Sequence, residues 1–131
     1  MRVLLDTHTF IWFVRNSGEL SSDARSFIES PASDVRISTA SIWEMSIKTA
    51  LGKLTLDGEF ERVLPDLIIN SIEIQEITFS HALKNKDLPF HHRDPFDRMI
   101  AAQALVEKVD LVSSDDVFDK YFAESEVKRI W

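Results

Sequence analysis

Four acidic residues lie where local sequence patterns would bring carboxylates to one side of a folded domain. Asp6 ends the apolar run "RVLL", and Asp115 follows the run "DLVS". Glu44 and Asp97 fall in the first turns of predicted helices that begin near "SIW" and "PFD". Carboxylates that converge to about 5 Å repel one another by about 3 kcal/mol for each pair at an effective dielectric near 20. A fold keeps such a cluster only if cations neutralise it or some members stay protonated, so the pattern predicts a divalent metal site.

The types of residue favour Mg²⁺ or Mn²⁺ in that site. Hard cations prefer oxygen ligands, and a chain without cysteine has no thiolate to offer to zinc. The histidines His8, His81, His91 and His92 show no spacing typical of zinc sites, and we expect His91 and His92 to lie on an exposed loop. Acidic clusters that hold Mg²⁺ most often serve phosphate chemistry, in which the metal orients a water and stabilises charge on the phosphoryl oxygens.

The charge balance agrees with a metal rather than lysine-rich phosphate contacts. The formal net charge of −7 has the wrong sign for a protein that holds nucleic acid mainly through Lys and Arg. Bound divalent metal would supply positive charge where the phosphate reacts. Arg93 and Arg98 flank Asp97, and Lys48 follows Glu44. These three basic residues are candidates to hold neighbouring phosphates of the substrate, or they are solvated surface charge.

Most of the acids also have a purely structural explanation. Ser41-x-x-Glu44 matches a capping box, and Glu44 could pair with Lys48 one helical turn later. The acid that ends the first predicted strand could be an ordinary turn residue. One of Asp115 and Asp116 could cap the short helix that follows them. The positions alone leave both readings open for these residues.

The segment "RDPFD" separates two neighbouring acids by role. Asp94 precedes Pro95, which predicts an N-cap followed by proline at the first helical position. Capping accounts fully for Asp94, so we assign it to the cap. Asp97 lies in the first turn, where the helix dipole favours an acid, but its helix neighbours such as Ile100 and Ala101 are apolar or small. We therefore assign Asp97 to the site.

Strands and helices alternate along the chain. The predicted strands are "RVLLD", "DVRIS", "IEIQEI", "DLVS" and a short one near "VKRI". The predicted helices are "THTFIWFVRN", "LSSDARSFIES" capped by Ser21, "SIWEMSIKTAL" ended by Gly52, "LDGEFERVLPDLIINS" kinked or split by Pro65, "SHALKNKDL" capped by Ser80, residues 95–108, and "DVFDKYF".

This alternation predicts an α/β fold: a three-layer α/β/α sandwich around a central, mostly parallel sheet. The 131 residues fit a single domain, residues 1–131, without a linker or repeat. No apolar run is long enough to span a membrane and no secretory signal begins the sequence, so we expect a cytoplasmic protein. Ligands of such sheets bind beyond the carboxyl ends of the strands, which is the side on which all four acids fall.

The segments "LLDTHTFIW", "SIWEMSIK", "HHRDPFDRMIAAQAL" and "LVSSDDVFDKY" have an order and spacing that resembles the PIN-domain ribonucleases. The closest resemblance is to the VapC-type toxins of bacterial toxin–antitoxin pairs, and it covers essentially the whole chain. It implies that the family's four acids are Asp6, Glu44, Asp97 and Asp115, the last in preference to Asp116. It further implies Mg²⁺- or Mn²⁺-dependent endonucleolytic cleavage of RNA, a homodimer, and inhibition by a cognate antitoxin that inserts a segment near the acidic site.

Two positions depart from the family pattern. His8 stands where many relatives carry Asn or Ser, and Ser113 stands where Thr is frequent, which keeps the hydroxyl. Neither change removes a metal ligand. On this resemblance Asp6 and Asp97 would bind metal directly, and the other two acids would complete the cage or position the attacking water.

Three other function classes fit the sequence less well. A receiver-like signalling domain needs adjacent acids after the first strand, and "LLDTHT" offers one. A haloacid-dehalogenase-type phosphatase needs a second aspartate where His8 stands. The alternative to the nuclease is a catalytically silent PIN-like module that acts through protein or RNA binding, and nuclease assays with Mg²⁺ and with EDTA would separate the two.

Overall fold

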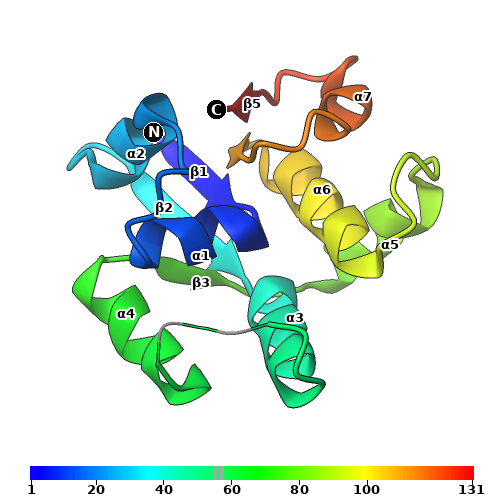
Figure 1. Ribbon diagram of the computed structural model, residues 1–131. Helices are drawn as coiled ribbons and strands as arrows, with labels where there is room; N and C mark the ends of the chain where they lie inside the picture. The colour runs from blue at the N-terminus through cyan, green and yellow to red at the C-terminus, as the bar shows by residue number, and fades with distance from the viewer. Residues whose placement is uncertain (55, 57) are drawn as a thin grey trace.

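A five-stranded parallel sheet forms the centre of the protein (Figure 1). The computed structural model describes residues 1–54, 56 and 58–131. The strand order is β3-β2-β1-β4-β5, and each of these neighbouring pairs is parallel, which confirms the predicted fold class. The strands are β1 (Arg2–Leu5), β2 (Asp34–Ser38), β3 (Glu73–Gln75), β4 (Asp110–Val112) and β5 (Arg129–Ile130).

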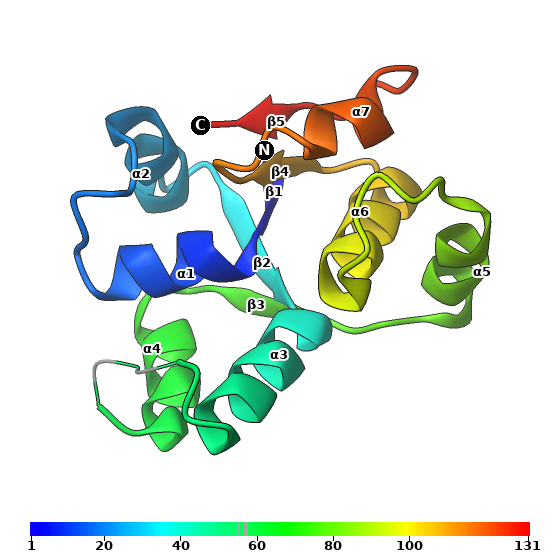
Figure 2. The same cartoon turned by 45° about the vertical axis from the view of Figure 1, so that its right-hand side comes forward.

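Helices cover both faces of this sheet, as a parallel sheet requires. Figure 2 shows α1, α2 and α4 on one side and α5, α6 and α7 on the other. The helices are α1 (Thr7–Val14), α2 (Ser22–Glu29), α3 (Thr39–Ala50), α4 (Val63–Ile69), α5 (Phe79–Asp87), α6 (Pro95–Glu107) and α7 (Phe118–Phe122), with a 3₁₀ turn, η1 (Phe60–Arg62), before α4. None of the helices in the described ranges is long and apolar enough to cross a membrane.

The alternation of side chains along β1 divides the core into two apolar clusters. Val3 and Leu5 point to one face and pack with residues of α1, α2, α3 and α4. Leu4 points to the other face and packs with residues of α6 and α7. All three side chains are at most 1% exposed. Strand β1 is therefore buried on both faces at the centre of the sheet, which explains why it is a continuous apolar run.

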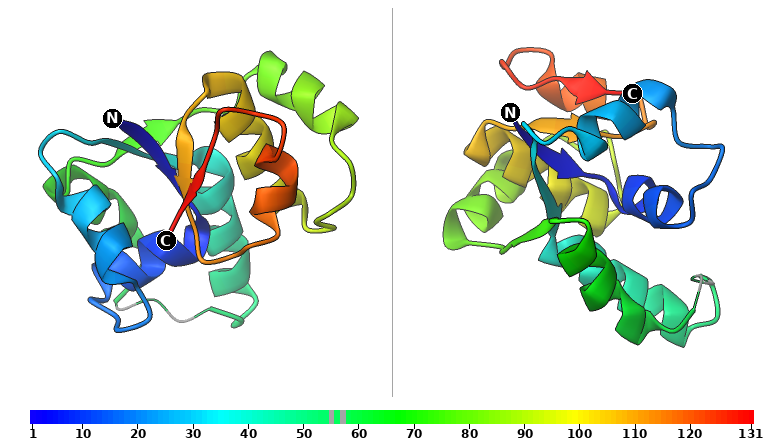
Figure 3. Two further views of the ribbon diagram at one scale, coloured as in Figure 1. Left: turned by 90° about the horizontal axis from the view of Figure 1, so that it is seen from above. Right: turned by 90° about the vertical axis from the view of Figure 1, so that its left-hand side faces the viewer.

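The carboxyl ends of the central strands lie side by side along one edge of the sheet. Strand β1 leads directly into α1, as the right-hand view of Figure 3 shows, and β2 leads directly into α3. Strand β4 ends there as well, because it pairs in parallel with β1. Residues that follow these strands, and the beginnings of α1 and α3, are thereby placed beside one another.

Several predicted helix ends agree with the structure. Ser21 is the N-cap of α2, and its side chain accepts a hydrogen bond from the Ala24 N–H. Gly52 follows α3 with a φ of +69°, a left-handed conformation in which glycine avoids the steric cost of a side chain. The local sequence pattern is sufficient for these positions because a cap depends only on neighbouring residues.

Two other helix boundaries differ from the predictions. Helix α3 begins at Thr39 with Ser38 as its N-cap, so the capping box predicted for Ser41 and Glu44 is wrong. Helix α5 is capped by Thr78 in a capping box rather than by Ser80. Each of these segments has a second hydroxyl residue upstream of the predicted cap, and the helix extends back to it.

The predicted helix over residues 56–71 is shorter than expected and starts with the 3₁₀ turn η1. Pro65 does not split α4, because it lies in the first turn of that helix, where its missing N–H costs no intrahelical hydrogen bond. Asp57, which belongs to the predicted stretch, lies outside the described residues.

Candidate active site

The four predicted acids line one cleft of about 300 Å³ at the carboxyl edge of the sheet. They come from four separate places in the chain: the end of β1, helix α3, the first turn of α6 and the segment after β4. The complete lining is Asp6, Thr7, His8, Trp12, Glu44, Lys48, Asp94, Asp97, Ser114 and Asp115. The structure thus brings together every acid that the sequence analysis assigned to the site, with the capping residue Asp94 beside them.

Asp6 is fixed in the cleft by hydrogen bonds to both of its carboxylate oxygens. It is the N-cap of α1, and its Oδ1 accepts from the Thr7 N–H at 2.8 Å. Its Oδ2 accepts from the Ser113 hydroxyl at 2.8 Å. The side chain lies in a buried position, and burial raises its pKa although the hydrogen bonds from Ser113 and Thr7 lower it. Asp6 is therefore a carboxylate held in one orientation.

Ser113 connects two of the predicted acids. Its hydroxyl donates to Asp6 and accepts the Asp115 N–H at 3.1 Å, so one buried oxygen links the end of β1 to the segment after β4. Ser113 is fully buried. The sequence indicates only that this position keeps a hydroxyl, and in the structure that hydroxyl sets the spacing between Asp6 and Asp115.

We expect Ser113→Ala to destabilise the protein by about 1–3 kcal/mol, because the buried Asp6 carboxylate and the Asp115 N–H both lose their hydrogen-bond partner. The substitution should also raise the pKa of Asp6, since the hydrogen bond from Ser113 is the strongest influence that lowers it. Urea unfolding measures the change in stability. Ser113→Thr keeps the hydroxyl and should retain most of it. Ser114→Ala, at an exposed neighbour, is the control, and equal stability of the two alanine variants would contradict this role of Ser113.

Glu44 is buried beneath the cleft and both of its oxygens have partners. The Thr7 hydroxyl lies 2.7 Å from Oε1 and 2.8 Å from the Ser41 hydroxyl. Because Thr7 has a single hydroxyl proton, it donates to Glu44 and accepts from Ser41. Lys48 donates to Oε2, which confirms the predicted pair one turn apart. This hydrogen bond also raises the pKa of Lys48.

Asp94 caps α6, as the sequence predicts. Its Oδ1 accepts from the Phe96 N–H at 2.8 Å and from the Asp97 N–H at 3.2 Å, and Pro95 occupies the first helical position. The cap fixes where α6 begins and thereby places Asp97 in its first turn, beside the cleft. Asp94 lies close enough to line the cleft as well, so its charge adds to the acidic cluster.

Asp97 carries the clearest electrostatic sign of crowding. Its pKa is raised to about 8, first by burial and then by repulsion from the other acids, which are Asp6, Asp94, Glu44 and Asp115. A single proton or cation shared by these groups would relieve this repulsion. The cleft therefore holds more negative charge than its own basic residues neutralise.

Asp115 contributes to both local structure and the site. Its Oδ1 accepts from the Val117 N–H at 3.0 Å, which shapes the turn before α7. Its Oδ2 lies 3.1 Å from Nε2 of His92. Asp116 is exposed on the surface and does not line the cleft. The choice of Asp115 over Asp116 thus agrees with the geometry.

The PIN domain family matches residues 3–123 of this chain. The chain belongs to the PIN domain family. The matched range includes all four acids of the cleft. No curated protein resembles the chain closely enough to match it.

Solved structures share the fold of this PIN domain at low sequence identity. The VapBC2 complex of Rickettsia felis, bound to a DNA fragment from its promoter, matches with a TM-score of 0.70 and 14% identity over 100% of both chains. VapBC-1 from nontypeable Haemophilus influenzae matches with a TM-score of 0.62 and 16% identity over 98% of this chain and 96% of that one. FitAcB from Neisseria gonorrhoeae matches with a TM-score of 0.55 and 18% identity over 97% of this chain and 95% of that one.

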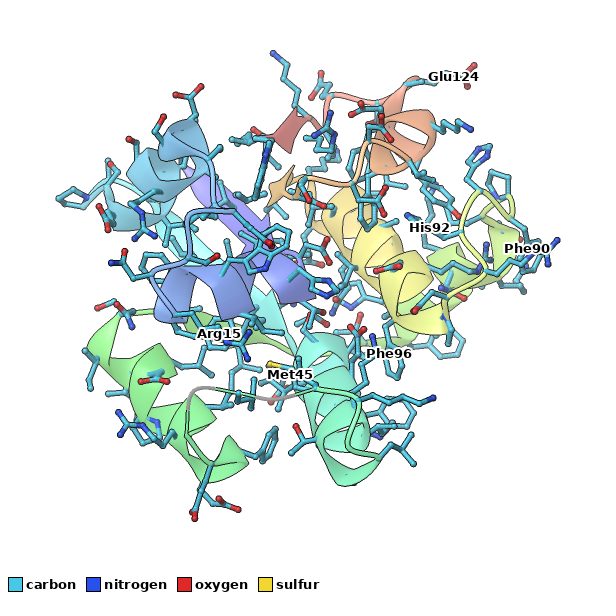
Figure 4. All side chains as sticks on the ribbon, in the orientation of Figure 1. Arg15, Met45, Phe90, His92, Phe96 and Glu124 are labelled. Carbon is cyan, nitrogen blue, oxygen red and sulfur yellow. The ribbon has the colours of Figure 1, made fainter. Side chains whose placement is uncertain are left out.

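His92 of this PIN domain lies at the site, although the sequence did not indicate it. The expectation of an exposed loop holds for His91 but is wrong for His92, whose side chain is only 13% exposed. Its Nδ1 lies 3.7 Å from Asp97 Oδ2, and Figure 4 shows the residue beside helix α6. No spacing in the sequence indicates this position, because the loop is held by a contact to Tyr121, 29 residues later.

The three basic residues predicted to hold phosphate have different environments in the structure. Lys48 lines the cleft, and Arg93 is exposed just before α6. Arg98 is buried and does not line the cleft, in contrast to the expectation of a phosphate contact. Its guanidinium donates to the backbone carbonyls of Asn85, Leu88 and Pro89.

The donor atoms in the cleft suit a divalent cation. Carboxylate oxygens dominate, as Mg²⁺ and Mn²⁺ prefer. His92, Asp97 and Asp115 each offer a ligand atom, and these atoms lie within 4.8 Å of one another. The raised pKa of Asp97 means that a cation bound here would also remove an electrostatic strain that the protein alone leaves in place.

Proposed function

We propose that this PIN domain is a divalent-metal-dependent endoribonuclease and the VapC-type toxin of a toxin–antitoxin pair. The observation that carries the proposal is the convergence of four carboxylates from distant segments in one cleft, with the pKa of one of them raised to about 8. Such a cluster is costly for a fold and useful for holding a cation. The fold that the chain shares with the VapBC structures supports the assignment to a toxin of this type.

The residues that would hold Mg²⁺ or Mn²⁺ are Asp6, Asp97 and Asp115. When bound, such an ion supplies a water of lowered pKa and stabilises the charge of the reacting phosphate. The chain's own contribution is orientation. Ser113 and the Thr7 N–H fix Asp6, and the Asp94 cap fixes the start of the helix that carries Asp97.

Glu44 has a different role in this proposal from the other three acids. Both of its oxygens are engaged, one by Thr7 and one by Lys48. It therefore holds Lys48 at the wall of the cleft, where an ammonium group can contact the phosphate of an RNA strand. Arg93, exposed beside Asp94, is the second candidate for a phosphate contact, whereas Arg98 is not.

Protein partners are also part of the proposal. We propose a homodimer and a cognate antitoxin that inserts a segment near the acidic cleft and keeps the toxin inactive in the cytoplasm. Exposed apolar side chains support contacts with other protein surfaces. Five of them lie on two helices, Leu64, Ile68 and Ile69 on α4 and Phe79 and Leu83 on α5.

The test is cleavage of total RNA by the purified chain in Mg²⁺ or Mn²⁺, compared with EDTA. We expect cleavage that depends on the metal and falls by at least about 100-fold in Asp6→Asn, which keeps the shape of the side chain but loses its charge. Asp116→Asn is the matched control, because Asp116 is acidic, exposed and outside the cleft. A silent binding module would give the same background with Mg²⁺ and with EDTA, and full activity of Asp6→Asn would remove the acidic cleft from the reaction.

A further inference from the structure

We propose that His92 is a metal ligand of this site, and that its imidazole makes the centre a mixed nitrogen and oxygen site that favours Mn²⁺ over Mg²⁺. The inference rests on the proposed function and extends it. The ligand atoms would be Nε2 of His92 and one carboxylate oxygen from each of Asp97 and Asp115. Each of the three residues offers a ligand atom, and these atoms, one ring nitrogen of His92 among them, lie within 4.8 Å of one another.

The distance between His92 and Asp115 already matches two ligands of a shared ion. Neighbouring ligands about 2.1 Å from an octahedral ion lie about 3 Å apart. Nε2 of His92 lies 3.1 Å from Asp115 Oδ2. The other ring nitrogen, Nδ1, faces Asp97 Oδ2 at 3.7 Å, so each ring nitrogen lies beside one of the two acids.

The Nε2 atom has a further property of a ligand without its ion. It is buried, and among the described residues it has no hydrogen-bond partner, because the contact with Asp115 is close in distance but not aligned as a hydrogen bond. A buried polar atom without a partner carries a cost that native proteins rarely accept. A cation held between His92 and Asp115 would satisfy both groups.

The imidazole ring is fixed by contacts that do not involve the acids. Its centroid lies 4.9 Å from that of Phe118, and it stacks on Tyr121 at 6.1 Å with an interplanar angle of 15°. The backbone N–H of His92 donates to the Tyr121 hydroxyl at 2.9 Å, and that hydroxyl donates to the Pro89 carbonyl at 2.9 Å. The ring is therefore held beside Asp97 and Asp115 before any metal arrives, as an efficient ligand should be.

The preference between ions follows from the ligand type. Mg²⁺ takes oxygen ligands and keeps several waters, so it gains little from an imidazole. First-row transition ions accept imidazole nitrogen more readily. Loss of the nitrogen should therefore weaken Mn²⁺ binding more than Mg²⁺ binding.

The experiment is pulsed EPR of Mn²⁺ bound to the purified chain, with calorimetric titration of Mn²⁺ and of Mg²⁺. The variant is His92→Phe, which keeps a ring against Phe118 and Tyr121 without nitrogen atoms. The control is His91→Phe, at the exposed neighbour. We expect a ¹⁴N modulation in the wild type and in His91→Phe, and its loss in His92→Phe. The dissociation constant for Mn²⁺ should rise at least about tenfold in His92→Phe, and that for Mg²⁺ by less than about threefold.

A wild-type spectrum without ¹⁴N coupling would overturn the proposal, and this reading needs no variant to fold. Equal weakening of Mn²⁺ and Mg²⁺ binding in His92→Phe would overturn it as well, because it would show a role in packing alone. These outcomes differ from failure of the nuclease proposal. Wild-type protein that binds no Mn²⁺, or that binds it equally after Asp97→Asn, would contradict the metal-dependent site itself.

Discussion

Asp97→Asn should abolish RNA cleavage and leave the fold intact, whereas Asp94→Asn should keep cleavage within about threefold of the wild type. The two residues are only three positions apart. Asp94 is not a metal ligand in the proposal, because its Oδ1 accepts the hydrogen bonds that cap the helix. Asn caps a helix about as well as Asp, so Asp94→Asn should lose only the charge interaction with the helix dipole, about 0.3–1 kcal/mol. Asp97→Asn removes a carboxylate that holds the cation.

Without metal, Asp97→Asn should make the folded protein more stable than the wild type at alkaline pH. The pKa of Asp97 is about 8 in the folded protein, above its ordinary value of 3.8. The folded state therefore binds this proton more tightly than the unfolded state does. The stability that this difference provides is fully present below about pH 4 and is lost as the pH rises through about 8. In EDTA, the wild type should lose stability between about pH 6 and about pH 8.5, and Asp97→Asn should lose less and be the more stable of the two at the upper end.

RNA cleavage assays and thermal unfolding in EDTA measure these two effects on the same protein samples. Asp94→Asn is the matched control, since it removes one nearby charge while keeping a cap. If Asp94→Asn abolished cleavage and Asp97→Asn did not, the two aspartates would have to exchange roles. A wild type whose stability rose from about pH 6 to about pH 8.5 would contradict the raised pKa of Asp97.

Arg98→Ala should destabilise the protein by about 3–5 kcal/mol, which is the largest loss of stability that we expect from the removal of a single buried charged side chain. The guanidinium donates to the carbonyls of Pro89, Asn85 and Leu88 at 2.8, 3.0 and 3.1 Å. It also lies 4.0 Å from the ring centroid of Phe90, a residue labelled in Figure 4. These carbonyls end helix α5 and begin the loop that leads to α6, so Arg98 fixes both. Removal would leave the buried Leu88 carbonyl without a donor, and it would take a charged donor from the Asn85 and Pro89 carbonyls, which keep the Leu88 N–H and the Tyr121 hydroxyl.

Arg98→Lys should recover only part of this stability, because an ammonium cannot reach three carbonyls with the geometry of a planar fork. Urea unfolding gives the free energies. Arg93→Ala is the matched control: this arginine is exposed, so its loss should change stability by less than about 0.5 kcal/mol, but it should raise the KM for RNA if the residue contacts phosphate. Unchanged stability of Arg98→Ala would show that the buried contacts contribute little.

The parts of the site that follow from local sequence could be predicted. Asp6 ends a strand, and Asp94 caps a helix that starts with proline, and both features depend on a few neighbouring residues. The parallel sheet follows from the alternation of apolar strands with helices, and it brings the strand ends to one edge. This is why all four acids could be expected on the same side before their side chains were placed.

Features that depend on contacts between distant segments could not be predicted. Arg98 is next to Asp97 in sequence but turns toward α5, because the loop after that helix returns its carbonyls to this point. His92 enters the site because a hydroxyl on α7 holds its backbone. Ser41 has the spacing of a cap to Glu44, yet its hydroxyl bonds to Thr7, 34 residues earlier in the chain. Local pattern cannot distinguish these outcomes from the simpler ones.

The central position of β1 has a consequence for the timing of synthesis. Strand β1 leaves the ribosome before its neighbour β4, which lies more than a hundred residues later, and Ser113 bonds to Asp6 across a separation of 107 residues. While these residues are being synthesised, a nascent chain holds Asp6 without the partner segment that completes the cleft. Because long-range pairing must wait for the later segment to emerge, the acidic cleft can form only after β4 and Asp115 have left the ribosome. A nuclease assembled in this order would stay inactive during the synthesis of the intervening residues.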